Sequence, residues 1–496
     1  MSRVLVYVLG GQGCQEAGQL DEAISQYESG NEVLVVHCDD SVGGCRDNFC
    51  FKRFYCRNCV FFQKKHASKY ISKRDIKYVP ISHFLTPQIK EISESYSPLY
   101  NSVADLKKLT YKGVDIGYGL LSSYVSSTRN LTPDLTNHLK SSFNRVLKTE
   151  VRVIEMISRA IDEFKPDLIV IHNGRHWTYK SVYGVADSLH IPFICTEFIH
   201  LPDGSEGKNY YINTYPHDKY ANAQKYLKFW DTTNDSEKQQ VGESFFKNKR
   251  TAKYAGDTIY TASQKLGSLP EEYDSKKRNI VIFNSSEDEM FSINSEIDND
   301  MLFPNQIVGI KTIIDHYRND DRVHIYLRVH PNLKGISYSY HTDLYQLSSP
   351  NFTIVPADSP ISSYSMLDIA DTVIVFGSTM GVEASYLGKR VVNLAFAFYD
   401  PLNIAFRPTT IDELWKCLDP QTPIMHNNEN AIKMGYFYMS HKHEFLRYVP
   451  LITHRFRVFN RDQESHSYRT IFGSHYLFWL YFKILSLLSR DNSSWQ

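Results

Sequence analysis

The sequence alternates short apolar segments, typical of buried strands, with segments of helical character, and the alternation occurs twice. In the first half, helical patterns near 16–29 and 182–189 separate the apolar segments. These apolar segments are 4–9, 33–37, 168–171 and 192–196. Apolar strands that alternate with helices predict a parallel sheet covered on both faces.

The alternation begins again after a polar stretch at 267–279, whose composition is typical of an interdomain linker. The expected strands are 280–283, 324–329, 352–355, 372–376 and 390–394, and the expected helices are 307–317, 363–370 and 381–387. This order predicts a second doubly wound sheet.

At 496 residues the chain exceeds the span over which one hydrophobic core usually grows. We therefore expect an N-terminal Rossmann-like domain over 1–265 that includes a cysteine-rich segment at 38–59. A second Rossmann-like domain is expected over 278–425. The segment 426–496 is expected to be largely helical and to pack back on the first domain.

Charge excludes some classes of partner. Lys+Arg and Asp+Glu both number 55, so no net electrostatic field favours nucleic acid, and an anionic ligand must be held by local geometry.

The N-terminus lacks a signal-peptide pattern, so we expect a cytoplasmic protein. The apolar segment 474–488 is too short to span a bilayer. It either docks on the core, which we favour, or touches a membrane surface.

Polar residues follow three strands of the second half. Ser285 and Ser286 follow the first strand, and His330-Pro331 follows the second, where the proline ends the strand. In open α/β sheets, ligands bind at these carboxyl ends. The imidazole of His330 is therefore expected to contact donor phosphate or to stabilise a leaving group.

The segment 377–383 after the strand at 372–376 is the most informative. Small and hydroxyl residues up to Ser378 and Thr379 precede a helix whose free amides attract phosphate. Glu383, about one turn further, is placed to accept hydrogen bonds from ribose hydroxyls. The alternative is that Ser378 only caps the helix and Glu383 is a solvated side chain.

The ordered set of motifs resembles a known family. Arg328-Val-His-Pro-Asn332, Ser363-Tyr-Ser-Met-Leu367 and Phe376-Gly-Ser-Thr-Met-Gly-Val-Glu-Ala384 look like bacterial capsule and surface-polysaccharide biosynthesis proteins, including GT-B β-Kdo transferases. They are also similar to GT-B sialyltransferases. The resemblance implies an α/β GT-B fold, two Rossmann-like doubly wound domains facing a cleft with C-terminal helices. It also implies that His330, Ser378 and Thr379 contact donor phosphate.

The first half offers weaker candidates. Arg175 follows the strand at 168–171 and is expected to reach the interdomain cleft. There it could pair with a phosphate or a sugar carboxylate. The alternative is an ordinary turn with a surface arginine. A transfer reaction also needs a group that takes the acceptor hydroxyl's proton. Asp115, in a glycine-rich turn, and Glu197, at the end of the strand at 192–196, are the candidates; each alternatively has a structural or acceptor-binding role.

Six of the eight cysteines lie within the first 59 residues. In a cytosolic chain such clustering favours metal binding or redox chemistry over structural disulfides. A structural zinc site would draw four thiolates from Cys38, Cys45, Cys50, Cys56 and Cys59. The alternative interpretation is a buried cluster of free thiols. If a metal binds, we expect its role to be structural and not catalytic, because a site closed by four thiolates has no open position for a substrate.

The polar strand ends and the family resemblance together predict a metal-independent glycosyltransferase. It would move a sugar from a CMP- or UDP-linked donor to a surface-polysaccharide or lipid-linked glycan acceptor, with peripheral contact to the inner membrane if the acceptor is lipid-linked. One alternative is a nucleotide-sugar epimerase or hydrolase on the same fold. Another is a non-enzymatic, metal-stabilised protein that binds or assembles glycans.

Overall fold

The computed structural model describes residues 1–9, 14–45, 53–200, 206–253, 260–424, 428–441 and 444–445. The strands are β1 (Arg3–Val8), β2 (Glu32–His37), β3 (Lys77–Pro80), β4 (Thr110–Tyr111), β5 (Val114–Asp115), β6 (Leu168–His172), β7 (Phe193–His200), β8 (Glu206–Ile212), β9 (Arg278–Phe283), β10 (Val323–Arg328), β11 (Phe352–Val355), β12 (Thr372–Val375), β13 (Arg390–Asn393) and β14 (Glu444–Phe445).

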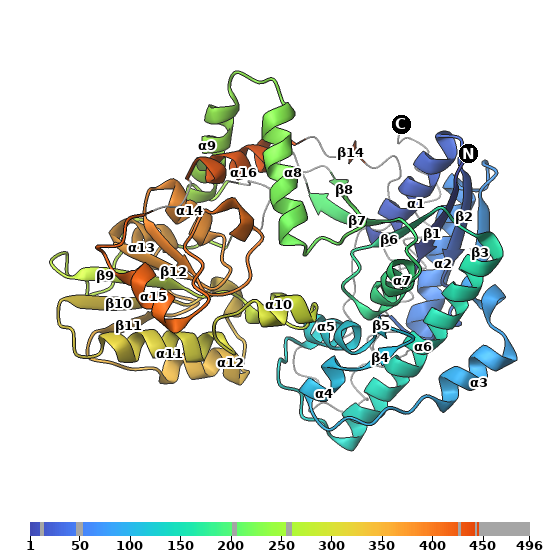
Figure 1. Cartoon of the computed structure of the whole chain (residues 1–496), viewed down its shortest axis with the longest axis horizontal. Helices are drawn as coiled ribbons and strands as arrows, with labels where there is room; N and C mark the ends of the chain where they lie inside the picture. The colour runs from blue at the N-terminus through green and yellow to red at the C-terminus, as the bar shows by residue number, and fades with distance from the viewer. Residues whose placement is uncertain are drawn as a thin grey trace. The chain divides into compact units, whose positions relative to one another are not determined.

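The α-helices are α1 (Cys14–Glu28), α2 (Arg53–Tyr70), α3 (Pro87–Ser95), α4 (Val103–Lys107), α5 (Gly117–Thr128), α6 (Asn137–Phe164), α7 (Trp177–Ser188) and α8 (Lys219–Thr232), followed by α9 (Lys238–Arg250), α10 (Ser295–Asn299), α11 (Gln306–Tyr317), α12 (Ser339–Thr342), α13 (Ser363–Ile369), α14 (Met380–Tyr386), α15 (Ile411–Leu418) and α16 (Asn428–Ser440). Figure 1 labels these elements along the chain.

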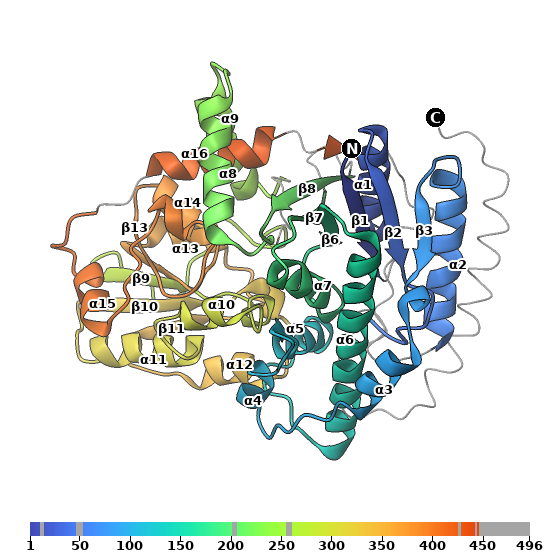
Figure 2. The same cartoon turned by 45° about the vertical axis from the view of Figure 1, so that its right-hand side comes forward.

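The first sheet has the order β14-β8-β7-β6-β1-β2-β3. Its strands from β3 to β7 are parallel, whereas β8 runs antiparallel to β7, and β14 antiparallel to β8. The chain crosses from β3 back over the sheet to β6, so the strand order reverses between β1 and β6. This reversal is the topological switch point of a doubly wound fold. Figure 2 shows α6 and α7 beside this sheet.

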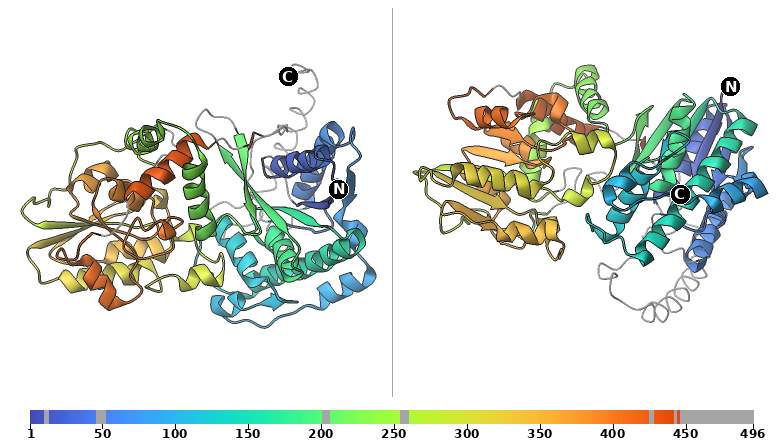
Figure 3. Two further views of the ribbon diagram at one scale, coloured as in Figure 1. Left: turned by 45° about the horizontal axis from the view of Figure 1, so that its top comes forward. Right: turned by 60° about the horizontal axis from the view of Figure 1, so that its bottom comes forward.

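The second sheet has the order β11-β10-β9-β12-β13, and every pairing in it is parallel. Its switch point lies between β9 and β12. Figure 3 shows both sheets from two further directions, the first in blue to green and the second in yellow to orange. The predicted fold class, an α/β protein with two Rossmann-like doubly wound sheets and helices near the C-terminus, is confirmed.

Alternate residues of the second sheet face two different cores. Ile280 and Ile282 of β9 join one hydrophobic cluster with residues of α11 and α15. Val281 and Phe283 of the same strand join another cluster with residues of α13 and α14. Burial on both faces explains why these strands appear in the sequence as continuous apolar runs.

Helices α8 and α9 follow the first sheet and pack against α16, which lies beside them in Figures 1 and 2. Their shared core is rich in aromatic residues, among them Tyr226, Phe245 and Phe437. Two glycines allow α9 and α16 to approach closely. A Cβ on Gly242 would lie 2.5 Å from the Ile432 carbonyl oxygen, and a Cβ on Gly435 would lie 2.6 Å from the Gly242 carbonyl oxygen.

Some expectations need correction. The predicted strand 192–196 is longer, because β7 pairs with β8 over 194–200 and the hairpin extends it to His200. Glu197 therefore lies inside a strand, and not after its end. Between β3 and β6 the chain also forms the β4–β5 hairpin, where Lys112 and Gly113 turn the chain with φ values of 49° and 78°. The boundaries predicted for the three domain segments remain a prediction.

Among the helices that the structure describes, none is both long and apolar enough to cross a membrane. The apolar segment 474–488 and most of the predicted C-terminal segment 426–496 lie outside the described residues.

The close approach of α9 and α16 gives a test of this packing. Gly242→Ala should lower the free energy of unfolding by about 1–3 kcal/mol, because its methyl group would push the α16 backbone away. Gly18→Ala is the matched control, since a Cβ there meets nothing within 4 Å and should stabilise its helix slightly. Urea unfolding measures both, and equal stability of the two variants would contradict the packing.

Candidate functional site

The carboxyl ends of β9, β10 and β12 bring the predicted donor residues to one edge of the second sheet. Asn284, buried at the end of β9, accepts a hydrogen bond from the backbone N–H of His330, at 2.8 Å. The two strand ends are thus joined next to the switch point, where ligands bind in doubly wound folds.

His330 is held in one orientation. Its Nδ1 accepts a hydrogen bond from the Asn332 N–H at 3.1 Å, and its ring meets the edge of Tyr260 with centroids 5.2 Å apart. In the neutral ring the proton is therefore on Nε2, which is the nitrogen suited to donate to a phosphate oxygen. The ring is half-buried, as expected for a group at the rim of a binding site.

Ser285 and Ser286 bond to neighbouring protein groups. The Gln306 side chain accepts from the Ser285 N–H at 3.1 Å and donates to its hydroxyl at 2.9 Å. Ser286 is buried, and its hydroxyl donates to Asp288 at 2.7 Å. Both serines shape the end of β9, and their predicted contact with the donor stays a prediction.

A buried ion pair that the sequence did not reveal lies beneath this edge. Arg129, at the end of α5, donates to both carboxylate oxygens of Asp288 at 2.7 and 3.0 Å. The same guanidinium donates to the Ser286 hydroxyl at 2.6 Å and to the Asn332 carbonyl at 2.9 Å. The two side chains are 9% and 8% exposed. Arg129 therefore connects a helix of the first half to two strand ends of the second.

The loop after β12 requires glycine at its second position, residue 377. Gly377 has φ of +80°, and a Cβ there would lie 2.3 Å from the Phe396 carbonyl oxygen. The following Ser378 hydroxyl accepts from the Met380 N–H at 3.3 Å, and Thr379 is exposed. The N-cap residue of α14 is Thr379, whose side chain makes no capping hydrogen bond, and Ser378 bonds only the first N–H of the helix. The predicted phosphate contact of Ser378 stays a prediction.

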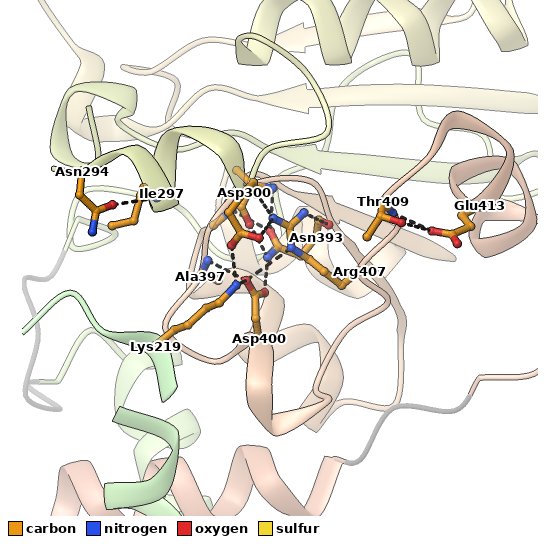
Figure 4. A network of polar contacts seen from close by, with 12 residues as sticks. Lys219, Asn294, Ile297, Asp300, Asn393, Ala397, Asp400, Arg407, Thr409 and Glu413 are labelled. Carbon is orange, nitrogen blue, oxygen red and sulfur yellow. Dashed lines mark hydrogen bonds and ion pairs between the residues drawn. The ribbon is translucent and has the colours of Figure 1, made fainter. Parts of the chain in front are cut away.

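A network of charged residues supports the Gly377 loop. Asn393 accepts from the Gly377 N–H at 2.9 Å and donates to Asp400 at 2.7 Å. Figure 4 shows Asp400 facing Arg407 and Lys219, whose closest nitrogens lie 3.4 and 3.7 Å from its carboxylate. Burial raises the pKa of Asp400, while these two cations act in the opposite direction. The network anchors the glycine loop to the start of α8.

Glu383 is buried on α14. Its carboxylate lies 3.6 Å from the ammonium of Lys249 on α9, and the Tyr364 hydroxyl hydrogen-bonds to it. Burial, together with the Glu383 charge, raises the pKa of Tyr364. Lys249 also donates to the Thr379 hydroxyl at 3.4 Å. A ribose would have to share Glu383 with these groups, and its predicted ribose contact remains a prediction.

In the first half, the loop after β6 is tightly bent, since Asn173 and Gly174 have φ values of 57° and 74°. The following Arg175 is half-buried, and its Nε donates to the Ser122 hydroxyl at 2.6 Å. The Asn173 amide donates to Glu197 at 2.5 Å. This hydrogen bond ties Glu197 of β7 to the loop that follows the neighbouring strand β6, which supports a structural role for this carboxylate.

Asp115 occupies a different environment. It ends β5, accepts the Tyr118 N–H at 3.0 Å and lies 3.5 Å from the ammonium of Lys180 on α7. Its side chain is 31% exposed, and burial raises its pKa although Lys180 acts in the opposite direction. A partly exposed carboxylate with a raised pKa has the properties of a general base.

Lys180 and His217 are additional polar residues that the sequence did not point out. Lys180 is buried, and its ammonium also donates to the Ile293 carbonyl at 3.0 Å. Burial lowers the pKa of His217, and the charges of Arg175 and Lys180 lower it further. The two cations therefore lie near one buried, neutral imidazole.

The cysteines divide by position. Cys38, Cys56 and Cys59 are buried and Cys45 is partly buried, whereas Cys50 lies outside the described residues. Burial raises the pKa of the Cys38 thiol to about 12. Within the described ranges, no group of three or more His, Cys, Asp or Glu side chains is arranged to hold a metal ion. Structural zinc stays a prediction, because one proposed ligand is not described.

The buried ion pair can be tested directly. Arg129→Ala should lower the free energy of unfolding by about 3–5 kcal/mol, since it leaves the Asp288 carboxylate buried without its cation. Arg322→Ala is the control: Arg322 also bonds both carboxylate oxygens of an aspartate, Asp320, but its side chain is 85% exposed. Denaturant midpoints measure both variants, and similar midpoints would show that the buried pair contributes little.

Residues 182–420 match the family model described as "Capsule polysaccharide biosynthesis protein". This range begins within α7, after Arg175, and contains the whole second sheet and every predicted donor residue from Ser285 to Glu383. We found no match among curated proteins.

Solved structures give distant similarities. The β-Kdo 2,4 transferase KpsC of Thermosulfurimonas dismutans is 14% identical, with 54% of this chain and 78% of that chain covered and a TM-score of 0.34. UDP-GlcNAc 2-epimerase from Neisseria meningitidis is 11% identical over 88% of this chain and 97% of that chain, with a TM-score of 0.28. The glycosyltransferase SsfS6 of Streptomyces sp. SF2575 is 10% identical over 88% and 96%, with a TM-score of 0.22.

Proposed function

Because residues 182–420 match the family model of capsule polysaccharide biosynthesis proteins, we propose that the chain is a GT-B glycosyltransferase. It transfers a sugar from a CMP- or UDP-linked donor to a surface-polysaccharide or lipid-linked glycan acceptor. The observation that carries this proposal is the meeting of the β9, β10 and β12 ends beside the switch point, within the segment that matches the family.

The donor is assigned to the second sheet. The proposed phosphate contacts are His330, through its Nε2, and the backbone amides at Ser378 and Thr379, with Ser285 and Ser286 shaping the same edge. Pro331 fixes the turn that presents the imidazole. Glu383 is assigned to the ribose hydroxyls.

Arg175 is proposed to pair with a donor phosphate or with a sugar carboxylate. It lies close enough to buried His217 to lower the pKa of that imidazole, which supports an anion at this position. An anionic ligand group would compensate the two cations, Arg175 and Lys180, that surround this neutral side chain.

Asp115 is the proposed general base, and it takes the acceptor hydroxyl's proton as the new bond to the anomeric carbon forms. The nucleotide leaves with the electron pair of the broken bond. Glu197 is the weaker candidate, because its position within β7 and its hydrogen bond from Asn173 favour a structural role.

The chemistry is proposed to need no metal ion, since His330 and Arg175 supply charge and donors for the phosphates. Structural zinc at the N-terminal cysteines is retained as a separate proposal. We also propose a cytoplasmic protein that contacts the inner membrane peripherally when its acceptor is lipid-linked. Equal numbers of acidic and basic residues give no support to a nucleic-acid partner.

Nucleotide binding tests the donor site. We expect CMP or UDP to raise the Tm of the full chain by several degrees, with GDP and dTDP as comparisons, because a ligand that binds the folded state stabilises it. His330→Ala and Ser378→Ala should reduce this shift while leaving the ligand-free Tm nearly unchanged. If none of the four nucleotides binds, the proposal that this site binds a nucleotide-sugar donor is wrong.

Catalysis is tested by nucleotide release from the donor that binds. Asp115→Asn should reduce release by about 100-fold or more, since the proton acceptor is lost, whereas Glu197→Gln should have a smaller effect. Release should require an acceptor and should persist in EDTA. Release without an acceptor would favour the hydrolase or epimerase alternative, and loss of activity in EDTA would contradict metal independence.

A further inference from the structure

Glu150 is a carboxylic acid in the interior of the first half. It lies in the middle of α6, on the helix face that packs into the core, and it has 0% exposure. Among the described residues, neither carboxyl oxygen has a hydrogen-bond partner. An ionised carboxylate without hydrogen bonds is very costly to bury, so the position calls for an explanation beyond packing.

Three helices enclose this carboxyl. A Cβ on Gly119 of α5 would lie 3.0 Å from the Glu150 Oε1, 3.0 Å from the Trp177 Cα and 3.3 Å from the Lys180 Cδ. The Glu150 oxygen and the Lys180 stem therefore border the same point beside Gly119. The absence of a side chain at Gly119 leaves the space that brings the acid of α6 next to the lysine of α7.

The ionisable groups around Glu150 come from several elements. Lys180 lies on α7 and pairs with Asp115 at 3.5 Å, while Tyr96 lies after α3. The charge of Asp298 on α10 acts on Asp115, and the charges of Lys180 and Arg175 both act on His217.

Glu150 and Asp115 are two buried or partly buried acids near one ammonium, that of Lys180, and the contact of 3.5 Å is made by Asp115. Burial and the Asp115 charge both raise the pKa of Glu150 well above its usual value, and Lys180 only partly opposes them. A neutral Glu150 leaves a balanced pair of Asp115 and Lys180, which the interior tolerates better than two carboxylates around one cation.

We infer that Glu150 is a positioning residue, held as a neutral acid, that reserves the Lys180 ammonium for Asp115. When Glu150 ionises, it competes for Lys180 and weakens the contact that orients Asp115. Only one part of this inference rests on the proposed function, namely the effect of Glu150 on catalysis through Asp115. The protonation state of Glu150 is a property of the folded chain that can be measured without substrate.

The first experiment measures Tm against pH for the full-length chain. A raised folded-state pKa means that the folded state holds a proton that the unfolded state has lost, so stability falls as pH rises above the unfolded pKa. Glu150→Gln removes this loss. Its Tm relative to wild type should therefore rise by about 3 °C or more between pH 5.5 and 9.

Glu163→Gln is the matched control, because Glu163 lies on the same helix with a side chain 42% exposed and paired with Arg159. Its Tm difference from wild type should stay constant over this pH range. Glu150→Met, also uncharged, should follow Glu150→Gln and serves if the amide variant does not fold. A constant Tm difference for both Glu150 variants would overturn the inference.

The second experiment measures the pH profile of nucleotide release. Glu150→Gln should keep the wild-type rate within about twofold at pH 7 and should lose the alkaline decline that ionised Glu150 causes. A loss of tenfold or more at every pH, with an unchanged profile, would overturn the inference. Full activity of Asp115→Asn would instead overturn the proposed base and leave the Tm result on Glu150 standing.

Discussion

Parallel pairing is the constraint on which the rest of this protein depends. Both sheets bury two faces under helices, so their loops gather only at the strand ends. In each sheet the strand order reverses once, between β1 and β6 or between β9 and β12. The polar residues of the candidate site follow from this geometry, because only at these ends can side chains face a ligand without interrupting a core.

Buried charge is the second theme, and it appears in both halves. Arg129 and Asp288 form a bidentate pair beneath the donor edge, and Lys180 pairs with Asp115 on the other side. Such pairs contribute little net stability compared with apolar contacts, but they fix geometry because breaking one is costly. Here each pair fixes residues at the site: Ser286 and Asn332 in one case, Asp115 in the other.

The two halves differ in how their polar groups are supported. The donor edge is rigid, since Asn284, Asn393 and Gly377 are each held by backbone or amide hydrogen bonds. The first half instead gathers groups whose ionisation depends on one another, among them Asp115, Lys180 and Glu150. This contrast suits the proposed function, in which the second half binds the nucleotide and the first half accepts the proton of the acceptor hydroxyl.

The sequence by itself determined the two alternating sets of strands and helices, because strands buried on both faces must be apolar along their length. It also placed His330, Ser378 and Arg175 at strand ends, since that depends only on where an apolar run stops. It did not reveal β3, β8 or β14, which lie toward the edge of the first sheet and lack such runs. Only the tertiary structure decided which polar groups meet. Arg129 and Asp288 are 159 residues apart, and Glu150 of α6 and the Lys180 stem of α7 border the same point beside Gly119 of α5. No local pattern encodes such contacts, because their energy depends on burial and on partners from distant segments.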